Sequence, residues 1–150
     1  MGGKYFNEWS VGETFRTPSR TITETDVVMF AAMSGDYNEI HTSEQFCKDS
    51  VFGKRIVHGL LGLSISHGLL FRSGYLEGTA IAFLGIESWS FKAPVFFGDS
   101  VSVTVKVLDK KESISKPDRG IVKLFLQIMN QDDQIVQEGV KVVMIRNHGI

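Results

Sequence analysis

One stretch of the chain decides the fold: His58-Gly59-Leu60-Leu61-Gly62-Leu63-Ser64-Ile65-Ser66-His67-Gly68-Leu69-Leu70-Phe71-Arg72. Its leucines and isoleucine nearly encircle a helix, so we expect this helix to be buried on most sides. Its glycines and serines lower helix propensity, and they leave room for a sheet, another chain or a ligand to approach closely. Arg72 suits the negative end of the helix dipole, and Gly74 is expected to end the helix.

The pattern changes to strands after this helix. Residues 79–91 are expected to form one long strand or two, and valines alternate with polar residues over 101–107, as in a half-buried strand. Residues 121–129 and 135–145 predict two further strands, joined by a hairpin turn at Asp132-Asp133. Helices early and antiparallel strands late indicate an α+β fold, with one sheet wrapped around one buried helix.

The region before the long helix has its own start and stop signals. Residues 15–22 predict a short strand interrupted by Pro18, which suits the edge of a sheet. Thr23-Glu24-Thr25-Asp26 has the form of a capping box, with Thr23 as N-cap and Asp26 reaching back to it. The helix that begins there should end at Gly35, which can adopt a left-handed conformation.

A polar segment follows that helix: Ser34-Gly35-Asp36-Tyr37-Asn38-Glu39-Ile40-His41. Five residues separate Asp36 from His41, which is about 140° on a regular helix, so on such a helix their side chains would diverge. They converge only if the segment is irregular, which Gly35 and Asn38 permit. The segment is therefore either a polar turn with a capping histidine or an acid–imidazole pair suited to chemistry on water.

Composition restricts the class of protein. The 150 residues predict one compact domain, 1–150, with an ordinary apolar share of 43%. A net charge of -1 argues against a nucleic-acid or anionic-membrane partner. No signal peptide or membrane-spanning run is expected. The single cysteine, Cys47, excludes an internal disulfide framework and favours a reducing compartment, the cytoplasm.

The polar segment also resembles a known family. Phe30-Ala31-Ala32-Met33-Ser34-Gly35-Asp36-Tyr37-Asn38-Glu39-Ile40-His41, followed by Ile56-Val57-His58-Gly59, resembles the MaoC-like dehydratases, the family of (R)-specific enoyl-CoA hydratases. Phe91-Lys92-Ala93-Pro94-Val95 with Gly98-Asp99 is similar to a second family stretch. The resemblance covers roughly residues 8–145 and implies a hot-dog fold.

The resemblance implies a role for each matching residue. Asp36 and His41 would be the catalytic pair, Asn38 would hold the site, and Gly59 would donate its backbone N–H to an oxyanion. The implied reaction is the reversible syn addition of water to a 2-enoyl thioester of coenzyme A, with no cofactor and no metal. A homodimer or larger homo-oligomer is also implied, because an unpaired edge strand favours pairing with a second copy.

These residue types suit that reaction. A base must take a proton from water as it attacks the β-carbon, an acid must protonate the α-carbon, and the enolate-like oxygen must be stabilised. Asp36 and His41 are two titratable groups able to hold one water between them. The Gly59 N–H lies at a helix start, where unpaired donors and the helix dipole favour negative charge.

Two departures from the family pattern concern the substrate. Glu39 stands where the family usually has proline, which loosens the backbone and adds a carboxylate near the site. His67 stands where short-chain members commonly have serine, and could narrow or polarise the acyl pocket. The acyl chain length and its branching, the choice between coenzyme A and acyl-carrier protein, and the direction of reaction all stay open.

Alternatives accompany several candidate residues. His58 is either a substrate-site residue or a helix-start histidine bonded to backbone, and His67 is either a pocket residue or a core histidine. Lys54 and Arg55 either meet the phosphates of coenzyme A or form a solvated loop. Asp36, His41 and His58 lack the closely spaced ligand pairs typical of zinc sites, so no metal is expected. The rival functions are a hot-dog acyl-CoA thioesterase and a non-catalytic acyl-CoA-binding protein.

Overall fold

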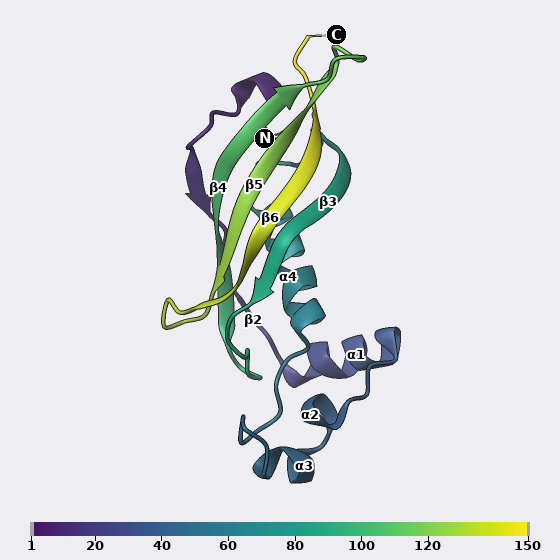
Figure 1. Cartoon of the computed structure of the whole chain (residues 1–150), viewed down its shortest axis with the longest axis vertical. Helices are drawn as coiled ribbons and strands as arrows, with labels where there is room; N and C mark the ends of the chain where they lie inside the picture. Colours follow the sequence, from purple (N-terminus) through teal and green to yellow (C-terminus); the bar gives the residue numbers. More distant parts are fainter. Residues whose placement is uncertain (1, 150) are drawn as a thin grey trace.

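The computed structural model describes residues 2–149 and shows a curved antiparallel sheet around one long helix (Figure 1). The prediction of an α+β hot-dog fold is confirmed. The elements in chain order are η1 (Phe6–Glu8), β1 (Thr14–Arg16), β2 (Arg20–Thr21), α1 (Glu24–Ser34), α2 (Glu39–Thr42), α3 (Glu44–Lys48), α4 (Gly59–Arg72), β3 (Ala80–Phe91), β4 (Ser100–Glu112), β5 (Arg119–Met129) and β6 (Ile135–Arg146).

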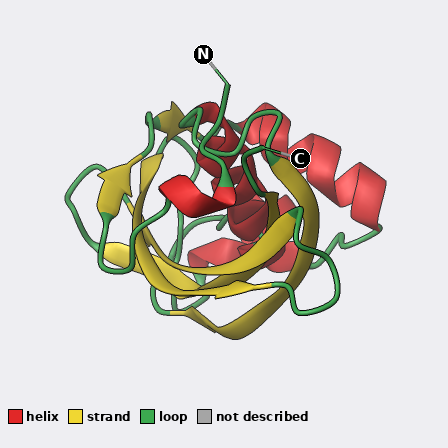
Figure 2. Cartoon of the chain, turned by 90° about the horizontal axis from the view of Figure 1, so that it is seen from above, coloured by secondary structure: helices red, strands yellow, loops and turns green. Residues whose placement is uncertain are grey.

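The sheet has the strand order β1-β4-β5-β6-β3, and β2 also pairs with β4. Both short strands flank Pro18 at the edge of the sheet, as the sequence predicts. Among residues 2–149, β3 is one long strand that pairs with β6 alone and forms the opposite edge. From above, the strands curve around a helix that lies inside the bend (Figure 2).

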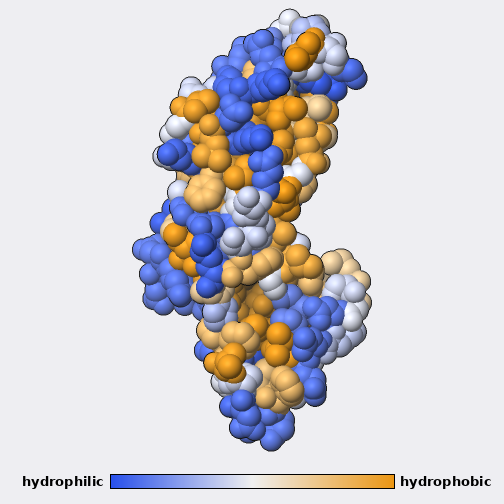
Figure 3. Space-filling view, viewed as in Figure 1, coloured by the Kyte–Doolittle hydropathy of each residue, from blue (hydrophilic) through white to orange (hydrophobic). Residues whose placement is uncertain are grey.

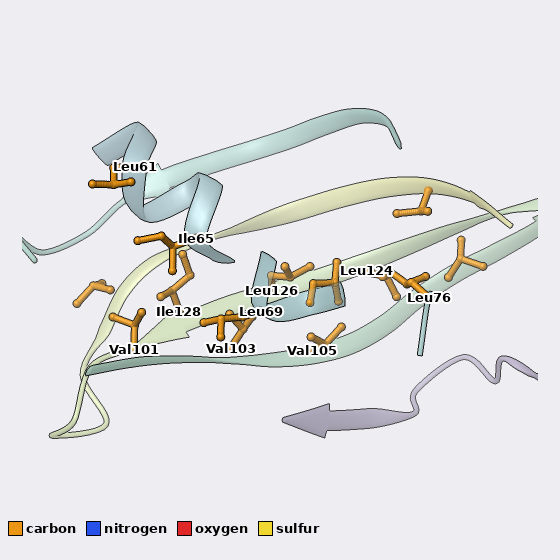
Figure 4. Close-up of a cluster of buried hydrophobic side chains, with 14 of the residues drawn as sticks. Leu61, Ile65, Leu69, Leu76, Val101, Val103, Val105, Leu124, Leu126 and Ile128 are labelled. Atoms are coloured by element: carbon orange, nitrogen blue, oxygen red, sulfur yellow. The ribbon is translucent and has the colours of Figure 1, made fainter. Parts of the chain in front are cut away.

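The core lies between α4 and the concave face of the sheet. The predicted alternation in β4 is confirmed, since every inward valine of that strand is at most 1% exposed. Leucines and isoleucines of α4 point toward β4 and β5 (Figure 4). The side chains that form this contact include Leu61, Ile65, Leu69, Val101, Val103, Val105, Leu124, Leu126 and Ile128.

The prediction that α4 is buried on most sides is wrong for one face. Leu61, Ile65 and Leu69 are buried, but Leu60 is 61% exposed and Phe71 is 39% exposed. The sheet curves around one side of the helix, so no strand of the described residues 2–149 packs against its opposite side. An apolar helix face without a partner is a candidate for contact with another chain.

The segment α1–α3 lies at the end of the sheet where α4 begins (Figure 1). The predicted capping box is present, and the Asp26 carboxylate accepts a hydrogen bond from the Thr23 backbone N–H at 2.9 Å. Gly35 ends α1 with a φ of 78° and donates to the Ala31 carbonyl. Within residues 2–149, no helix is both long and apolar enough to cross a membrane.

Candidate active site

A chain of local hydrogen bonds shapes the loop that carries Asp36. The Ser34 hydroxyl accepts from the Asp36 N–H at 3.2 Å, and the Asp36 carboxylate accepts from the Asn38 N–H at 3.2 Å. Asn38 then caps α2, because its side-chain oxygen accepts from the Ile40 N–H. These are the short-range bonds that Ser, Asp and Asn favour in turns and at helix starts. The irregular loop that convergence of Asp36 and His41 requires is therefore present.

His41 lies on α2 with its side chain turned inward and only 7% exposed. Its Nδ1 is 2.8 Å from the Ile56 carbonyl oxygen, so Nδ1 carries the proton and Nε2 is left as an acceptor. That Nε2 lies 3.9 Å from Oδ2 of Asp36, whose side chain is half exposed. The two groups that diverge on a regular helix therefore face each other across a gap.

Burial lowers the pKa of His41 below its ordinary value of 6.5. The Ile56 carbonyl opposes this shift, the neighbouring His58 ring adds to it, and the Asp36 carboxylate opposes it. The net direction keeps the imidazole neutral at neutral pH. His41 therefore presents a basic nitrogen toward Asp36.

His58 supports this arrangement from the N-cap position of α4. Its Nε2–H donates to the Asp36 backbone carbonyl at 2.9 Å, and its ring stacks on the His41 ring with 3.8 Å between centroids. The Nδ1 of His58 is buried and has no hydrogen-bond partner among residues 2–149. The backbone contact predicted as the alternative for His58 is present, and it joins α4 to the Asp36 loop.

A cavity of about 430 Å³ opens beside His41, which is one of its lining residues. Gly59, the first residue of α4, lines it with no side chain of its own, and a Cβ there would lie 2.8 Å from the Phe91 ring. The Phe91 ring therefore packs against the first turn of α4, where N–H donors lack partners within the helix, and Gly59 brings backbone to the cavity wall. Six of the lining residues are Ile40, His41, Val57, Gly59, Phe91 and Gln137.

Asp36, His41 and His58 each offer one potential ligand atom, and these atoms lie within 4.8 Å of one another. The two imidazole rings are stacked with an interplanar angle of 28°. Rings that are almost parallel direct their in-plane lone pairs side by side, whereas ligands of one ion must converge on a point about 2.1 Å from each nitrogen. The cluster therefore suits a bridging water better than a metal ion.

The two basic residues of the preceding loop have different surroundings. Arg55 forms ion pairs with Glu24 at 3.0 Å and Glu44 at 2.5 Å, so it ties the loop to α1 and α3. Lys54 is exposed, with its Nζ 4.3 Å from the centroid of the Phe96 ring. The two carboxylates already balance the charge of Arg55, which leaves Lys54 as the better candidate for a phosphate group.

His67 lies more than two turns along α4 from Gly59 and lines a second cavity of about 150 Å³ with Phe71 and Phe83. It lies within reach of Lys141, a residue that the sequence reasoning missed. Gln137, also missed, donates to the Gly59 carbonyl at 3.1 Å and lines the first cavity. One sequence pattern could have revealed both residues: polar side chains occupy alternate positions of a strand that otherwise has the apolar pattern of a core strand.

The sequence matches the family described as MaoC like domain over residues 6–124. The (R)-specific enoyl-CoA hydratase of Aeromonas caviae is 36% identical over 135 residues, which span 90% of this chain and 94% of that protein. Protein MaoC of Klebsiella aerogenes is 40% identical over 100 residues, which span 67% of this chain but only 29% of that protein. The crystal structure of the MaoC-like dehydratase from Rhodospirillum rubrum is 26% identical, with a TM-score of 0.85 over 99% of this chain and 100% of that one.

Proposed function

The chain belongs to the MaoC-like family, and on that premise we propose that it is an (R)-specific enoyl-CoA hydratase/dehydratase. As a hydro-lyase of this kind it adds water reversibly to the double bond of a 2-enoyl thioester. The observation that carries the proposal is the 3.9 Å separation of Asp36 Oδ2 and His41 Nε2 beside the cavity at Gly59. Two acceptors at that separation suit one water that donates a hydrogen bond of about 2.8 Å to each.

The two acceptors orient the water for syn addition. As the water oxygen bonds to the β-carbon, His41 Nε2 takes one of its protons, and the Asp36 carboxylate holds the other hydrogen and stabilises the imidazolium. The imidazolium then returns its proton to the α-carbon on the same face of the double bond. Positioned acid–base groups of this kind contribute about 10²–10⁴-fold in rate.

Gly59 supplies the stabilisation of the enolate-like oxygen. Its N–H lies in the first turn of α4, where the helix dipole favours negative charge. Gln137 donates to the Gly59 carbonyl and so holds the first residue of α4 against β6. Loss of one such donor typically costs about 2.7–4 kcal/mol of barrier.

The test is hydration of crotonyl-CoA, followed by loss of enoyl absorbance. We expect Asp36→Asn and His41→Ala each to lower kcat/KM by at least about 10²-fold. Asp49→Asn is the matched control, because Asp49 is an exposed carboxylate just beyond α3 and outside the site. Full activity of Asp36→Asn would contradict the assignment.

The same assay separates the rival functions. A thiol reagent detects free coenzyme A, which a thioesterase releases and a hydratase does not. We expect the wild-type protein to hydrate crotonyl-CoA without release of thiol. Release of thiol without loss of the double bond would favour the thioesterase, and tight binding without either reaction would favour a non-catalytic acyl-CoA-binding protein.

The proposed reaction uses neither metal nor other cofactor. Because the His41 and His58 rings are stacked, their lone pairs do not converge on one point where a metal ion could bind. The nucleophile is instead a water molecule held by Asp36 and His41. Treatment with EDTA, followed by gel filtration, is expected to leave crotonyl-CoA hydration unchanged. Activity that falls and returns on addition of one divalent ion would overturn this part of the proposal.

We propose that the acyl group of the substrate is carried by coenzyme A. We also propose that the protein is located in a reducing compartment, the cytoplasm. Lys54 is the exposed cation of the loop before α4 and suits a phosphate of coenzyme A. Cys47, the only cysteine of the chain, is a buried free thiol. A free buried thiol is compatible with a cell interior where glutathione keeps cysteines reduced.

We also assign the protein to a homodimer that forms through β3. β3 pairs with β6 on one side, and its other edge has no strand beside it among residues 2–149. Apolar side chains lie exposed along it, including Ile81, Phe83, Leu84 and Ile86. Figure 3 shows hydrophobic surface on the side of the molecule where β3 lies in Figure 1. A second copy paired edge to edge would cover both features.

A further inference from the structure

Lys141 is the one lysine among residues 2–149 that is buried inside the sheet, at 1% exposure. It lies in the middle of β6 on the inward face of the sheet, the same face as Gln137, Val143 and Ile145. Its ammonium group is 3.3 Å from the Ser66 hydroxyl and 3.3 Å from His67 Nδ1. No carboxylate forms an ion pair with it in the described part of the chain, and its other near neighbours are the rings of Phe83 and Trp89.

Burial of an ammonium group in a protein core costs free energy when no anion lies beside it. The Lys141 ammonium group has three N–H donors and here meets two neutral acceptors, so both its charge and one donor lack a match. Burial lowers its pKa to about 8, a value that still leaves most of the group charged at neutral pH. A carboxylate brought to this place would form a charge-assisted hydrogen bond with little competition from water.

The position of Lys141 relative to the proposed reaction site defines which carboxylate could reach it. Ser66 follows Gly59 by seven residues, about 10 Å along α4 at 1.5 Å per residue. On β6, Lys141 follows Gln137 by four residues, about 13 Å, and Gln137 contacts Gly59. A thioester oxygen at the Gly59 N–H and a carboxylate at Lys141 each use a hydrogen bond of about 2.9 Å, which leaves about 4–7 Å between the two ligand oxygens.

Trp89 spans the distance between these two points. Its indole N–H donates to Gln137 at 3.1 Å, its ring centroid is 5.6 Å from the Lys141 ammonium, and it covers Gly139 on the β6 face between them. A Cβ at Gly139 would lie 2.5 Å from the ring, so only glycine leaves this place for the indole. This half-buried indole separates the cavity at Gly59 from the ammonium of Lys141, so a ligand that reaches both must displace it.

We propose that Lys141 binds a carboxylate at the far end of the acyl chain, so that the preferred substrates are thioesters of short dicarboxylic acids. This inference rests on the proposed function, because it places the thioester at Gly59. The separation of about 4–7 Å between the two ligand oxygens suits acyl chains of four to six carbons. His67 and Ser66 position the ammonium from α4, which gives His67 a function in selecting the substrate.

Binding of saturated thioesters tests this inference without requiring turnover. Calorimetry compares three pairs of equal chain length: succinyl-CoA with butyryl-CoA, glutaryl-CoA with valeryl-CoA, and adipyl-CoA with hexanoyl-CoA. We expect the wild-type protein to bind the dicarboxylic member of at least one pair about tenfold more tightly, as a charge-assisted hydrogen bond provides. Lys141→Met should abolish that preference and leave binding of the neutral member unchanged or stronger.

Lys123→Met is the matched control, since Lys123 also lies in the sheet but pairs with Glu87 on the outer face. It should keep the wild-type preference. Lys141→Gln provides a second variant of similar length, and thermal unfolding shows that each variant is folded.

Equal binding within all three pairs, or a preference that persists in both folded Lys141 variants, would overturn the inference. The proposed function fails separately, by absence of crotonyl-CoA hydration.

Discussion

At the scale of single residues, the site depends on which atom of each histidine carries a proton. The Nδ1–H of His41 donates a hydrogen bond to the Ile56 carbonyl, and the Nε2–H of His58 donates one to the Asp36 carbonyl. Two backbone acceptors therefore fix both tautomers, and a neutral His41 is left with its basic nitrogen toward Asp36. Backbone atoms supply this control, so no third catalytic side chain is needed to orient the imidazole.

The pH dependence of hydration follows from this arrangement. His41 acts as a base only when it is neutral, and burial places its pKa below the ordinary value of 6.5. Activity should therefore fall as the pH drops through a value below 6.5. In Asp36→Asn the carboxylate that raises the pKa of His41 is lost, so the fall should move to still lower pH.

The measurement is kcat/KM for crotonyl-CoA across the acid range in both proteins, with residual activity followed in the variant. A fall that moves to higher pH in Asp36→Asn would contradict the electrostatic relation between the two groups.

The free energy of unfolding should show how much the buried charge of Lys141 destabilises the folded protein. Its pKa is lowered from 10.5 to about 8, so the unfolded state binds the extra proton between these values, and stability rises with pH in that window. Below about pH 8 the full penalty applies, about 3 kcal/mol at about 1.36 kcal/mol per pH unit. Lys141→Met keeps the stem of the side chain and removes the charge.

Urea unfolding at about pH 7 is therefore expected to show a gain of up to about 3 kcal/mol for Lys141→Met. The difference from the wild type should shrink toward about pH 10, where folded wild-type protein no longer carries the charge. A variant that is several kcal/mol less stable at both pH values would show that the ammonium contacts stabilise the fold.

At the scale of elements, the end of α1 places Asp36. Gly35 adopts a φ of 78° and turns the chain out of the helix one residue before Asp36. Gly12, in the turn before β1, adopts a φ of 88° far along the chain from the site. A Cβ would meet nothing within 4 Å at either glycine, so alanine acts there through backbone conformation alone.

Gly35→Ala and Gly12→Ala therefore form a matched pair. Each should lose about 1–2 kcal/mol of stability, the cost of a left-handed conformation for a residue with a Cβ. Only Gly35→Ala should also lower kcat/KM for crotonyl-CoA, because it displaces the loop that holds Asp36 opposite His41. Equal activity of the two variants would show that the loop is held by its other hydrogen bonds.

The elements that could be predicted from the sequence are those governed by local rules. The capping box at Thr23, the helix end at Gly35 and the hairpin at Asp132 depend on residues a few positions apart, and all three are present. The exposure of Leu60 and the burial of Lys141 depend on which face of each element meets the sheet. That choice is made by strand register between distant segments, so the period of one strand alone does not reveal it.

The same distinction applies to the candidate site. The five-residue spacing allows Asp36 and His41 to converge only in an irregular loop, and it is the resemblance to the MaoC-like dehydratases that implies the pair. The contact of Gln137 with Gly59 joins positions 78 residues apart, and no local pattern predicts such a pair.

At the scale of the whole molecule, residues 2–149 leave apolar surface exposed on two elements that lie close to each other, β3 and α4. One is the free edge of β3, and the other is the face of α4 that carries Leu60 and Phe71. A sheet that wraps only one side of its helix cannot cover either surface within one chain. A second copy paired through β3 would extend the sheet and bring its own helix to the uncovered side.

The dimer can be tested by light scattering after size exclusion, where a dimer has twice the 16.7 kDa mass of one chain. Leu84 is 46% exposed on β3, and Leu84→Lys introduces a charge at the proposed interface of each copy. Because a symmetric interface contains each substitution twice, like charges are brought together there and the variant should be a monomer. Ile114→Lys is the control, since Ile114 is 93% exposed in the turn between β4 and β5, and it should stay a dimer. If the wild-type protein elutes as a monomer, these apolar surfaces contact a partner other than a second copy. If Ile114→Lys alone dissociates the dimer, the interface lies at the turn between β4 and β5 and not at β3.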